Sequence, residues 1–136
     1  MNTYSMFDKN FLESNLYQKF VRENPEKGGL KIRAYAASEA IPIAGLKVEV
    51  STLFEDNKIV FFDGFTNESG VIERISLAAP KRDENNLSVP SKRVYEIRAT
   101  YEKEKVTQIY HVNVYPGICI VQTIHIVPPM VRKEEL

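Results

Sequence analysis

The sequence has a single cysteine, no excess of either charge and no long apolar run, and each lack excludes a class of protein. Because Cys119 is the only cysteine, the chain can form neither an internal disulfide nor a zinc site built from cysteines. This favours a reducing compartment. Eighteen basic residues balance eighteen acidic ones, so no net field attracts a nucleic acid backbone or an anionic membrane surface. We therefore predict no nucleic-acid partner.

The N-terminus does not have the pattern of a classical signal peptide. Asp8 and Glu13 interrupt the stretch where a signal peptide needs a continuous apolar run. No run elsewhere approaches the roughly eighteen apolar residues of a membrane-spanning helix. The sequence thus predicts no membrane span and, as the simplest location, the cytoplasm.

The 136 residues have the composition of a globular protein, with 43% hydrophobic and 26% charged residues. Apolar residues first recur at helical spacing, and Pro25 disfavours helical geometry before it, so we expect a helix over about residues 8–22, capped by Ser5 or Asp8. We divide the chain into an N-terminal helical segment, residues 1–28, and a β-sandwich domain, residues 29–136.

From Gly29 onward the hydrophobic period changes from helical spacing to two, the period of a strand with one solvated face. Alternating runs separated by turn residues predict six or seven strands, for which a two-layer antiparallel sandwich is the natural arrangement. We expect the last two strands to form a hairpin around Pro116 and Gly117, residues suited to a tight turn.

The stretch TNESGVIERISLAAP, residues 66–80, is the most motif-like in the chain. Two interpretations compete: a turn over Asn67 to Gly70 that starts a strand, or a reactive corner with Ser69 as nucleophile and Glu68 as its helper. The turn accounts for every residue, because polar residues and a glycine are what a tight turn needs. The nucleophile lacks a nearby histidine and the G-x-S-x-G elbow, so we predict a turn.

Other catalytic and metal-binding interpretations have little support. In the expected hairpin His111 and His125 lie roughly 10 Å apart, too far to share a metal ion. Two dispersed carboxylates could serve a glycosidase, but a compact sandwich offers little room for a cleft. We predict no catalytic residues, no metal site and no cofactor.

Aromatic residues are the best candidates for contact with a partner. Tyr35 and Tyr115 fall on the polar side of their strands, where aromatic side chains can anchor a glycan or a protein. Phe7, Phe11 and Phe20 give the N-terminal helix an apolar face. That face either folds back over the sandwich or docks on another protomer or partner.

The order of features resembles the transthyretin-like, carboxypeptidase-regulatory-like β-sandwich domain, and most of all the N-terminal domain of spore cortex-lytic enzymes. The resemblance rests on GLKIRAY, PIAGLKVEV, TNESGVIERISLAAP, YEIRATY and VNVYPGICIVQTIHIVP, over about residues 29–129. It implies a seven-stranded antiparallel Greek-key sandwich of prealbumin type behind an N-terminal α-helix. The pattern consists of turns and strands and contains no catalytic signature. Thr100 before Tyr101 departs from the Gly-Tyr that is usual in the family.

The resemblance implies a non-enzymatic binding or assembly module of a spore-forming bacterium, cytoplasmic or spore-associated, whose partner is a protein or a cell-wall glycan. Two alternatives stay open. One is a self-associating structural subunit, a homo-oligomer held by the N-terminal helix. The other is a small glycan-active enzyme.

Overall fold

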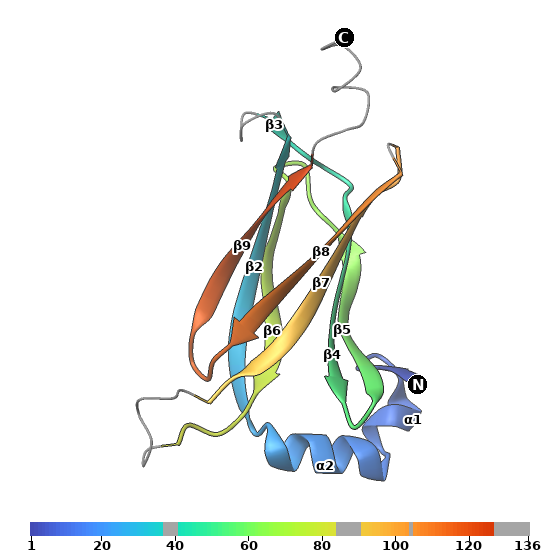
Figure 1. The fold of residues 1–136 in the computed structure, drawn as a ribbon, viewed down its shortest axis with the longest axis vertical. Coiled ribbons are helices and arrows are strands. Elements are labelled where there is room, and N and C mark those ends of the chain that lie inside the picture. Colours follow the sequence, from blue (N-terminus) through green and yellow to red (C-terminus); the bar gives the residue numbers. More distant parts are fainter. Residues whose placement is uncertain (37–40, 84–90, 104, 127–136) are drawn as a thin grey trace.

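The computed structural model describes residues 1–36, 41–83, 91–103 and 105–126, which form a sandwich of two β-sheets with short helices across one end (Figure 1). Figure 1 shows the two sheets facing each other along the long axis, with the helical segment below the turn between β4 and β5. The mainly β architecture expected from the alternating pattern is confirmed.

The described residues contain two helices and nine strands. In chain order they are β1 (Thr3–Ser5), α1 (Lys9–Leu12), α2 (Asn15–Glu23), β2 (Glu26–Ala36), β3 (Ile41–Pro42), β4 (Lys47–Phe54), β5 (Asn57–Phe65), β6 (Val71–Ala79), β7 (Arg93–Tyr101), β8 (Val106–Val114) and β9 (Cys119–Ile126). The seven long strands match those expected from the alternating runs. The predicted boundary between residues 28 and 29 falls inside β2.

The strands pair in two mixed sheets, so the expectation of a purely antiparallel, seven-stranded sandwich is wrong in detail. The five-stranded sheet has the order β1-β5-β4-β7-β8, and in the four-stranded sheet β2 lies between β9 on one side and β6 and β3 on the other. Two of the pairings are parallel, β1 with β5 and β2 with β9. The two additional strands, β1 and β3, are only three and two residues long.

The predicted hairpin between the last two long strands does not form. β8 pairs with β7 in the five-stranded sheet, whereas β9 pairs with β2 in the other sheet. The turn at Pro116 and Gly117 therefore carries the chain from one layer of the sandwich to the other. A Pro-Gly turn fixes local geometry only, and either arrangement satisfies its backbone.

The predicted turn over Asn67 to Gly70 is confirmed. Asn67 Oδ1 accepts hydrogen bonds from the backbone N–H groups of Ser69 and Val71, at 2.9 and 3.0 Å, and Gly70 has a φ of 74°. Such an Asx turn uses the short side chain to hold the backbone, and the left-handed φ favours glycine. Ser69 is thus an exposed turn residue.

A bulge in β6 shifts the alternation that follows this turn. Lys31 of β2 lies opposite both Glu73 and Arg74, because Leu30 pairs with Ile75 but Ile32 pairs with Ile72. Simple alternation, with a period of two, would place Ile72 and Ile75 on opposite faces of the strand. Both are buried, since the extra residue returns the second isoleucine to the core side.

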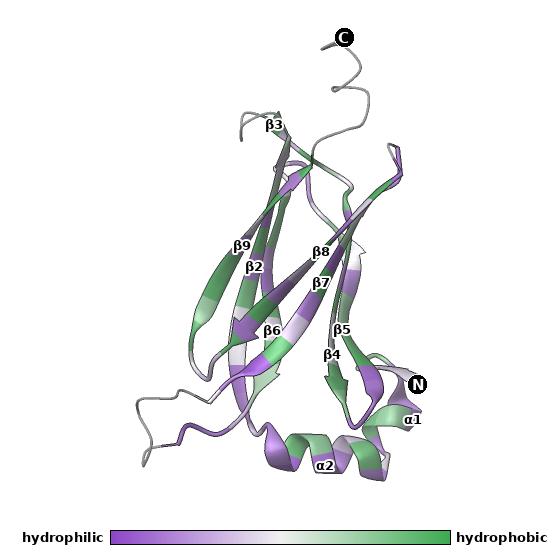
Figure 2. Cartoon of the chain, viewed as in Figure 1, coloured by the Kyte–Doolittle hydropathy of each residue, from purple (hydrophilic) through white to green (hydrophobic). Residues whose placement is uncertain are grey.

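The main core lies between the sheets, and hydropathy alternates along most strands accordingly (Figure 2). Tyr95 of β7 is fully buried in it and donates a hydrogen bond of 2.6 Å to the backbone carbonyl of Ala78 in β6. This bond crosses from one sheet to the other. Burial raises the pKa of the Tyr95 hydroxyl well above its ordinary value, so the group stays neutral and remains a donor.

The N-terminal helical region consists of two helices where one was expected. Asp8 caps α1 as predicted, accepting from the N–H of Asn10, and α2 ends at Glu23 ahead of Pro25. The break lies at Ser14, whose hydroxyl accepts from the N–H of Tyr17 at 3.1 Å and donates to the carbonyl of Phe11 at 2.6 Å. In the part of the chain that is described, no helix is long and apolar enough to cross a membrane.

The apolar side of these helices closes the end of the sandwich. Phe11 and Phe20 are 2% and 1% exposed and pack in a second cluster with Phe54 and Ile59. The ring of Phe20 meets that of Phe54 edge-on, with the centroids 5.2 Å apart. Burying each phenylalanine contributes about 2–3 kcal/mol to folding. Of the two alternatives for this face, folding back over the sandwich is the one observed.

Arg93, the first residue of β7, links the end of the helical segment to β4. Its Nε donates to Asn24 Oδ1 at 2.7 Å, and its Nη1 donates to Thr52 Oγ1 at 3.2 Å and to the Leu53 carbonyl at 3.0 Å. The guanidinium also lies over the ring of Phe20, 5.1 Å from its centroid. Partial burial lowers the pKa of Arg93, although a guanidinium stays charged at any ordinary pH.

We predict that Arg93→Ala lowers the free energy of unfolding by about 2 kcal/mol or more. The change leaves the buried side chains of Asn24 and Thr52 without their charged donor and removes a cation–π contact. Arg98→Ala is the matched control, because Arg98 lies on the same strand with its side chain 44% exposed, and we expect it to cost no more than about 0.5 kcal/mol. Urea unfolding measures both values. Equal losses in the two variants would contradict the anchoring role of Arg93.

Candidate functional site

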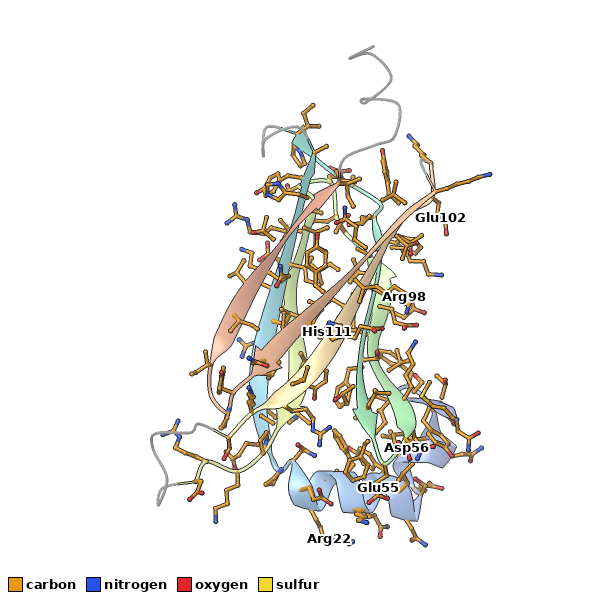
Figure 3. All side chains as sticks on the ribbon, viewed as in Figure 1. Arg22, Glu55, Asp56, Arg98, Glu102 and His111 are labelled. Carbon is orange, nitrogen blue, oxygen red and sulfur yellow. The ribbon has the colours of Figure 1, made fainter. Side chains whose placement is uncertain are left out.

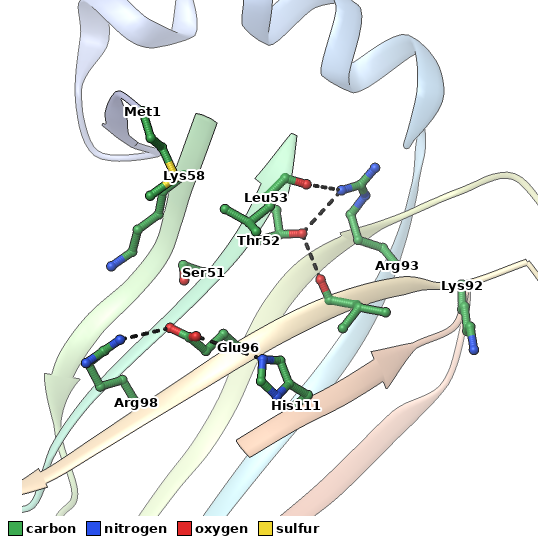
Figure 4. Close-up of a pocket in the computed structure, with 11 residues that line it drawn as sticks. Met1, Ser51, Thr52, Leu53, Lys58, Lys92, Arg93, Glu96, Arg98 and His111 are labelled. Atoms are coloured by element: carbon green, nitrogen blue, oxygen red, sulfur yellow. Dashed lines mark hydrogen bonds and ion pairs between the residues drawn. The ribbon is translucent and has the colours of Figure 1, made fainter. Parts of the chain in front are cut away.

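A hollow of about 520 Å³, lined by both charged and apolar side chains, lies on the outer face of the five-stranded sheet (Figure 4). Four neighbouring strands of that sheet, β4, β5, β7 and β8, contribute side chains to it. Those that the argument below uses are Ser51, Leu53, Lys58, Glu96, Arg98 and His111. The helices lie across the end of the sandwich (Figure 1), away from Arg98 and His111 of this face (Figure 3).

The strand alternation sends these polar residues outward. On β7, Tyr95 and Ile97 are buried in the core while Glu96 and Arg98 lie between and beyond them on the other face. The register then aligns residues across strands: Ser51 of β4 pairs with Glu96, and Glu96 pairs with His111 of β8. Figure 3 shows Arg98 and His111 near the middle of the sheet.

A partly buried ion pair forms one side of this face. Lys58 Nζ lies 2.5 Å from Glu49 Oε1, and the two side chains are 22% and 26% exposed. Glu49 Oε1 is itself shielded from solvent, and Lys58 is the cation that faces it. Removing one partner of such a pair leaves a shielded charge uncompensated.

Glu96 occupies the centre of the hollow between two basic side chains. Its carboxylate lies 3.5 Å from Arg98 Nη2 and 3.9 Å from His111 Nε2 (Figure 4). Leu53, Val94 and Ile109 add apolar surface around these charges, being 63%, 46% and 48% exposed. The face therefore offers donors, acceptors and apolar patches side by side.

The row Ser51, Glu96, His111 contains the residue types of a hydrolytic triad in an unproductive order. In a triad the histidine lies between the acid and the nucleophile, so that it can accept the nucleophile's proton. Here the acid lies in the middle, and Ser51 and His111 are two strands apart, about 10 Å at the usual strand spacing. His111 therefore cannot act as the base for Ser51 in this arrangement.

The sheet also brings two carboxylates to one face, which bears on a glycan-active enzyme. Glu49 and Glu96 are diagonal neighbours on adjacent strands, with Cβ atoms about 7–8 Å apart. A glycosidase needs both groups to reach the scissile bond. Lys58 contacts Glu49, and one oxygen of that carboxylate is shielded. Glu49 is therefore part of a structural salt bridge, and Glu96 is the more accessible acid of the two.

Two of the residues predicted to contact a partner are buried inside the chain. Phe11 and Phe20 are almost fully covered by the sandwich end, so their selection as partner-binding residues is corrected. The helical spacing identified their apolar face correctly. It could not say which surface covers that face, and here the surface is the chain's own β4 and β5.

The other three predicted residues do not form one surface. Phe7 is 70% exposed between β1 and α1. Tyr35 lies near the far end of β2, opposite Pro42, where its hydroxyl receives a hydrogen bond from Arg33 Nε at 3.3 Å. Tyr115 is half-buried at the turn after β8. Whether any of them binds a partner stays a prediction.

The two histidines lie on different sheets, His111 on β8 and His125 on β9. Their separation therefore no longer follows from the hairpin register assumed from the sequence. Within the described ranges there is no group of three or more histidine, cysteine or acidic side chains arranged to hold a metal ion.

Reasoning from the sequence missed the hollow. Its residues come from four strands, and each is unremarkable in its own strand. The sequence does indicate that Glu49, Glu96 and Arg98 lie on the outer face, because they alternate with core residues along their strands. Recognising that they share one place required the order of the strands.

We predict that Lys58 and Glu49 are coupled in stability. Lys58→Met should cost about 1–3 kcal/mol by leaving a shielded carboxylate oxygen without its cation, and adding Glu49→Gln should recover part of that loss. The control pair is Lys31 and Glu73, which are 3.5 Å apart with the acid 72% exposed, where coupling should stay below about 1 kcal/mol. A double-mutant cycle from denaturant unfolding measures both couplings. Equal values for the two pairs would show that the partial burial of Glu49 has no energetic effect.

No protein-family model and no curated protein matches this sequence. Among solved structures, an (S)-allantoin synthase matches with a TM-score of 0.51 and 11% identity, covering 82% of this chain and 46% of the synthase chain. Transthyretin from Sparus aurata matches with a TM-score of 0.42 and 13% identity over 71% of this chain and 90% of its own. A catechol 1,2-dioxygenase from an Acinetobacter species gives 0.41 and 12% over 99% and 52%.

These similarities concern the fold. Of these three the synthase has a TM-score above 0.5, and at 11% identity it shows a shared β architecture and no more. The chain spans less than half the length of that synthase. The β-sandwich expected from the resemblance thus holds at the level of the coarse fold, and the relation to the transthyretin-like domain and to spore cortex-lytic enzymes stays a prediction.

Proposed function

We propose that this protein is a non-catalytic binding or assembly module that contacts its partner through the outer face of the five-stranded sheet. The observation that carries the proposal is the open hollow around Glu96, where charged and apolar side chains from four strands lie together without a helix above them. Binding sites on β-sandwiches need no mobile part, because the sheet already fixes the positions of such side chains.

The chemistry of this face suits a ligand that is polar and apolar at once. Arg98 and His111 can donate hydrogen bonds, Glu96 can accept them, and Leu53 and Val94 present apolar surface. Sugar rings combine hydroxyl groups with apolar faces, so a cell-wall glycan fits this description. A polar peptide segment of a protein partner is the other occupant that it fits.

Two other functions receive less support from the geometry. A small glycan-active enzyme has less support for two reasons. The acid Glu96 lies between Ser51 and His111, and Glu49 is held in an ion pair with Lys58. The burial of Phe11 and Phe20 removes the apolar face through which the N-terminal helix was to join a homo-oligomer.

The cellular setting rests on the family resemblance alone. We propose a spore-forming bacterium as the source and a cytoplasmic or spore-associated location. Reaction of an antibody with purified spores, and its absence from vegetative cells of the same strain, would support this setting.

Sedimentation with purified, insoluble peptidoglycan tests the glycan as partner. We expect the wild-type protein to sediment with the sacculi and the Arg98→Ala and His111→Ala variants to bind about tenfold more weakly, because each loses a hydrogen-bond donor to the ligand. Arg33→Ala on the outer face of the four-stranded sheet is the matched control and should bind like the wild type.

Two results would contradict this assignment. Failure of the wild-type protein to sediment would exclude the glycan in favour of a protein partner. An equal loss of binding in the Arg33→Ala control would show that the five-stranded face is not the specific site. Circular dichroism on every variant separates loss of binding from loss of fold.

A further inference from the structure

Residues 106–126 contain no aspartate, glutamate, lysine or arginine, although such residues make up 26% of the chain. This run includes all of β8 and β9 and the turn between them. Each of the other long strands, β2, β4, β5, β6 and β7, carries at least two charged residues. The absence of charge is thus confined to two strands that follow each other.

The topology places both of these strands at sheet edges. β8 ends the five-stranded sheet, and β9 pairs with β2 alone among the described residues. On the opposite side of the five-stranded sheet the three-residue β1 covers β5 only from Lys58 to Val60, and the rest of β5 is an edge that carries Asp63. On the opposite side of the other sheet, the edge strand β6 carries Glu73 and Arg74. Charged side chains on an edge strand are a common protection against pairing with another chain. That protection is present on one side of this sandwich and missing on the other.

The backbone of β9 is arranged to accept another strand. The N–H of Gly29 donates to the Ile118 carbonyl at 2.9 Å, and the parallel register then runs without a shift from Cys119 to Ile126. In a parallel ladder the residues of one strand alternate between facing the partner and facing away. Ile118, Ile120 and Ile124 therefore bond to β2, and Cys119, Val121 and Thr123 direct their N–H and C=O groups toward the edge.

Other edge protections are also missing from this part of β9. Between Cys119 and Thr123 there is no proline and no bulge. Val121 is 54% exposed, and Ile118 just before the strand is 50% exposed. A flat, uncharged edge with exposed apolar side chains is the arrangement that favours strand addition.

We propose that β9 pairs antiparallel with β9 of a second copy of this chain, about a twofold axis at Val121, and joins the two four-stranded sheets into one. In this register Val121 lies opposite its own copy and Cys119 lies opposite Thr123. All three are residues whose backbone groups face the edge, so each pair exchanges two hydrogen bonds. The Thr123 carbonyl also accepts from its neighbour Gln122 Nε2 at 2.9 Å and has a second lone pair for the partner strand.

The lack of charge is what makes a second copy the fitting occupant. A twofold axis places the residue at its centre opposite its own copy, so a charge there would meet an equal charge. From Cys119 to Thr123 the strand has no charged side chain, and valine meets valine at the axis. This surface is separate from the hollow around Glu96, so the proposal does not depend on the proposed function.

Intermolecular disulfide formation tests the register directly. In the proposed dimer Cys119 of one copy and residue 123 of the other form a hydrogen-bonded pair with Cα atoms about 5.5 Å apart, a distance that a disulfide spans. We expect Thr123→Cys to give a covalent dimer on mild oxidation, reversed by a thiol reductant. Ile109→Cys is the matched control, because Ile109 is also exposed and lies on β8, the other uncharged edge strand. We expect this variant to remain largely monomeric.

Light scattering across a range of concentrations tests the association without a new cysteine. We expect the wild-type mass to rise from 15.6 kDa toward twice that value, reversibly, since a small interface gives weak association. Val121→Lys should remove the rise by placing two lysines at the axis, and Ile109→Lys should leave it unchanged. A wild-type protein that stays monomeric at every concentration, or cross-linking of Thr123→Cys no faster than that of Ile109→Cys, would overturn the proposal. Because Val121 is largely exposed, both lysine variants should fold, which circular dichroism checks.

Discussion

The parallel pairing of β2 with β9 is the constraint on which the rest of the structure depends. β2 lies between β9 on one side and β6 on the other, so it holds the four-stranded sheet together. Its N-terminal half contains Gly28 and Gly29, where the backbone of the turn after β8 approaches closely. A Cβ atom at Gly28 would lie 2.6 Å from the Tyr115 carbonyl oxygen, a distance that no real side chain tolerates. The glycine pair thus makes room for the chain to cross from one sheet to the other.

This crossing determines which surfaces stay open. A hairpin of β8 and β9 would have placed both strands in one sheet, each covering an edge of the other. Because they lie in different sheets, each has one unpaired edge among the described residues, and both edges belong to the same uncharged run. The helices cover the end of the sandwich, where the ring of Phe20 packs against the guanidinium of Arg93. The outer face of the five-stranded sheet is left uncovered, and the hollow lies there.

The parts of the fold that depend on local sequence could be predicted, and those that depend on pairing could not. Alternation located the seven long strands, and the turn at Asn67 was predictable because an Asx turn and a left-handed glycine are made within four residues. The break at Ser14 was harder, since a serine inside a helical pattern is compatible with a continuous helix until its hydroxyl is seen to cap the next one. Parallel pairing leaves no local mark, because Cys119 opposite Gly29 looks the same in sequence as Cys119 in a hairpin.

The candidate site illustrates the same limit at the level of function. The aromatic residues selected from the sequence were individually conspicuous, yet Phe11 and Phe20 serve the core and Phe7, Tyr35 and Tyr115 lie apart. The residues that do gather, Ser51, Glu96 and His111, are brought together by the register of three strands. A site of this kind is a property of the sheet, since Glu96 and Arg98 are neighbours on one strand and the other members come from different strands. Sequence reasoning therefore finds such a site only after strand order is known.

The unpaired edge of β9 and the hollow around Glu96 lie on different sheets, and this affects how tightly a dimer would bind a ligand. A dimer joined through β9 leaves the outer face of each five-stranded sheet free, so it presents two hollows to a repetitive ligand. Single polar sites on a flat sheet bind weakly, because much of the interaction energy offsets the loss of hydration. Two such sites on one rigid body bind a polymeric ligand more tightly than either alone, provided that both can engage at once. For a cell-wall glycan, whose units repeat, self-association and glycan binding would then be parts of one mechanism, and β9 would contribute to affinity without touching the ligand.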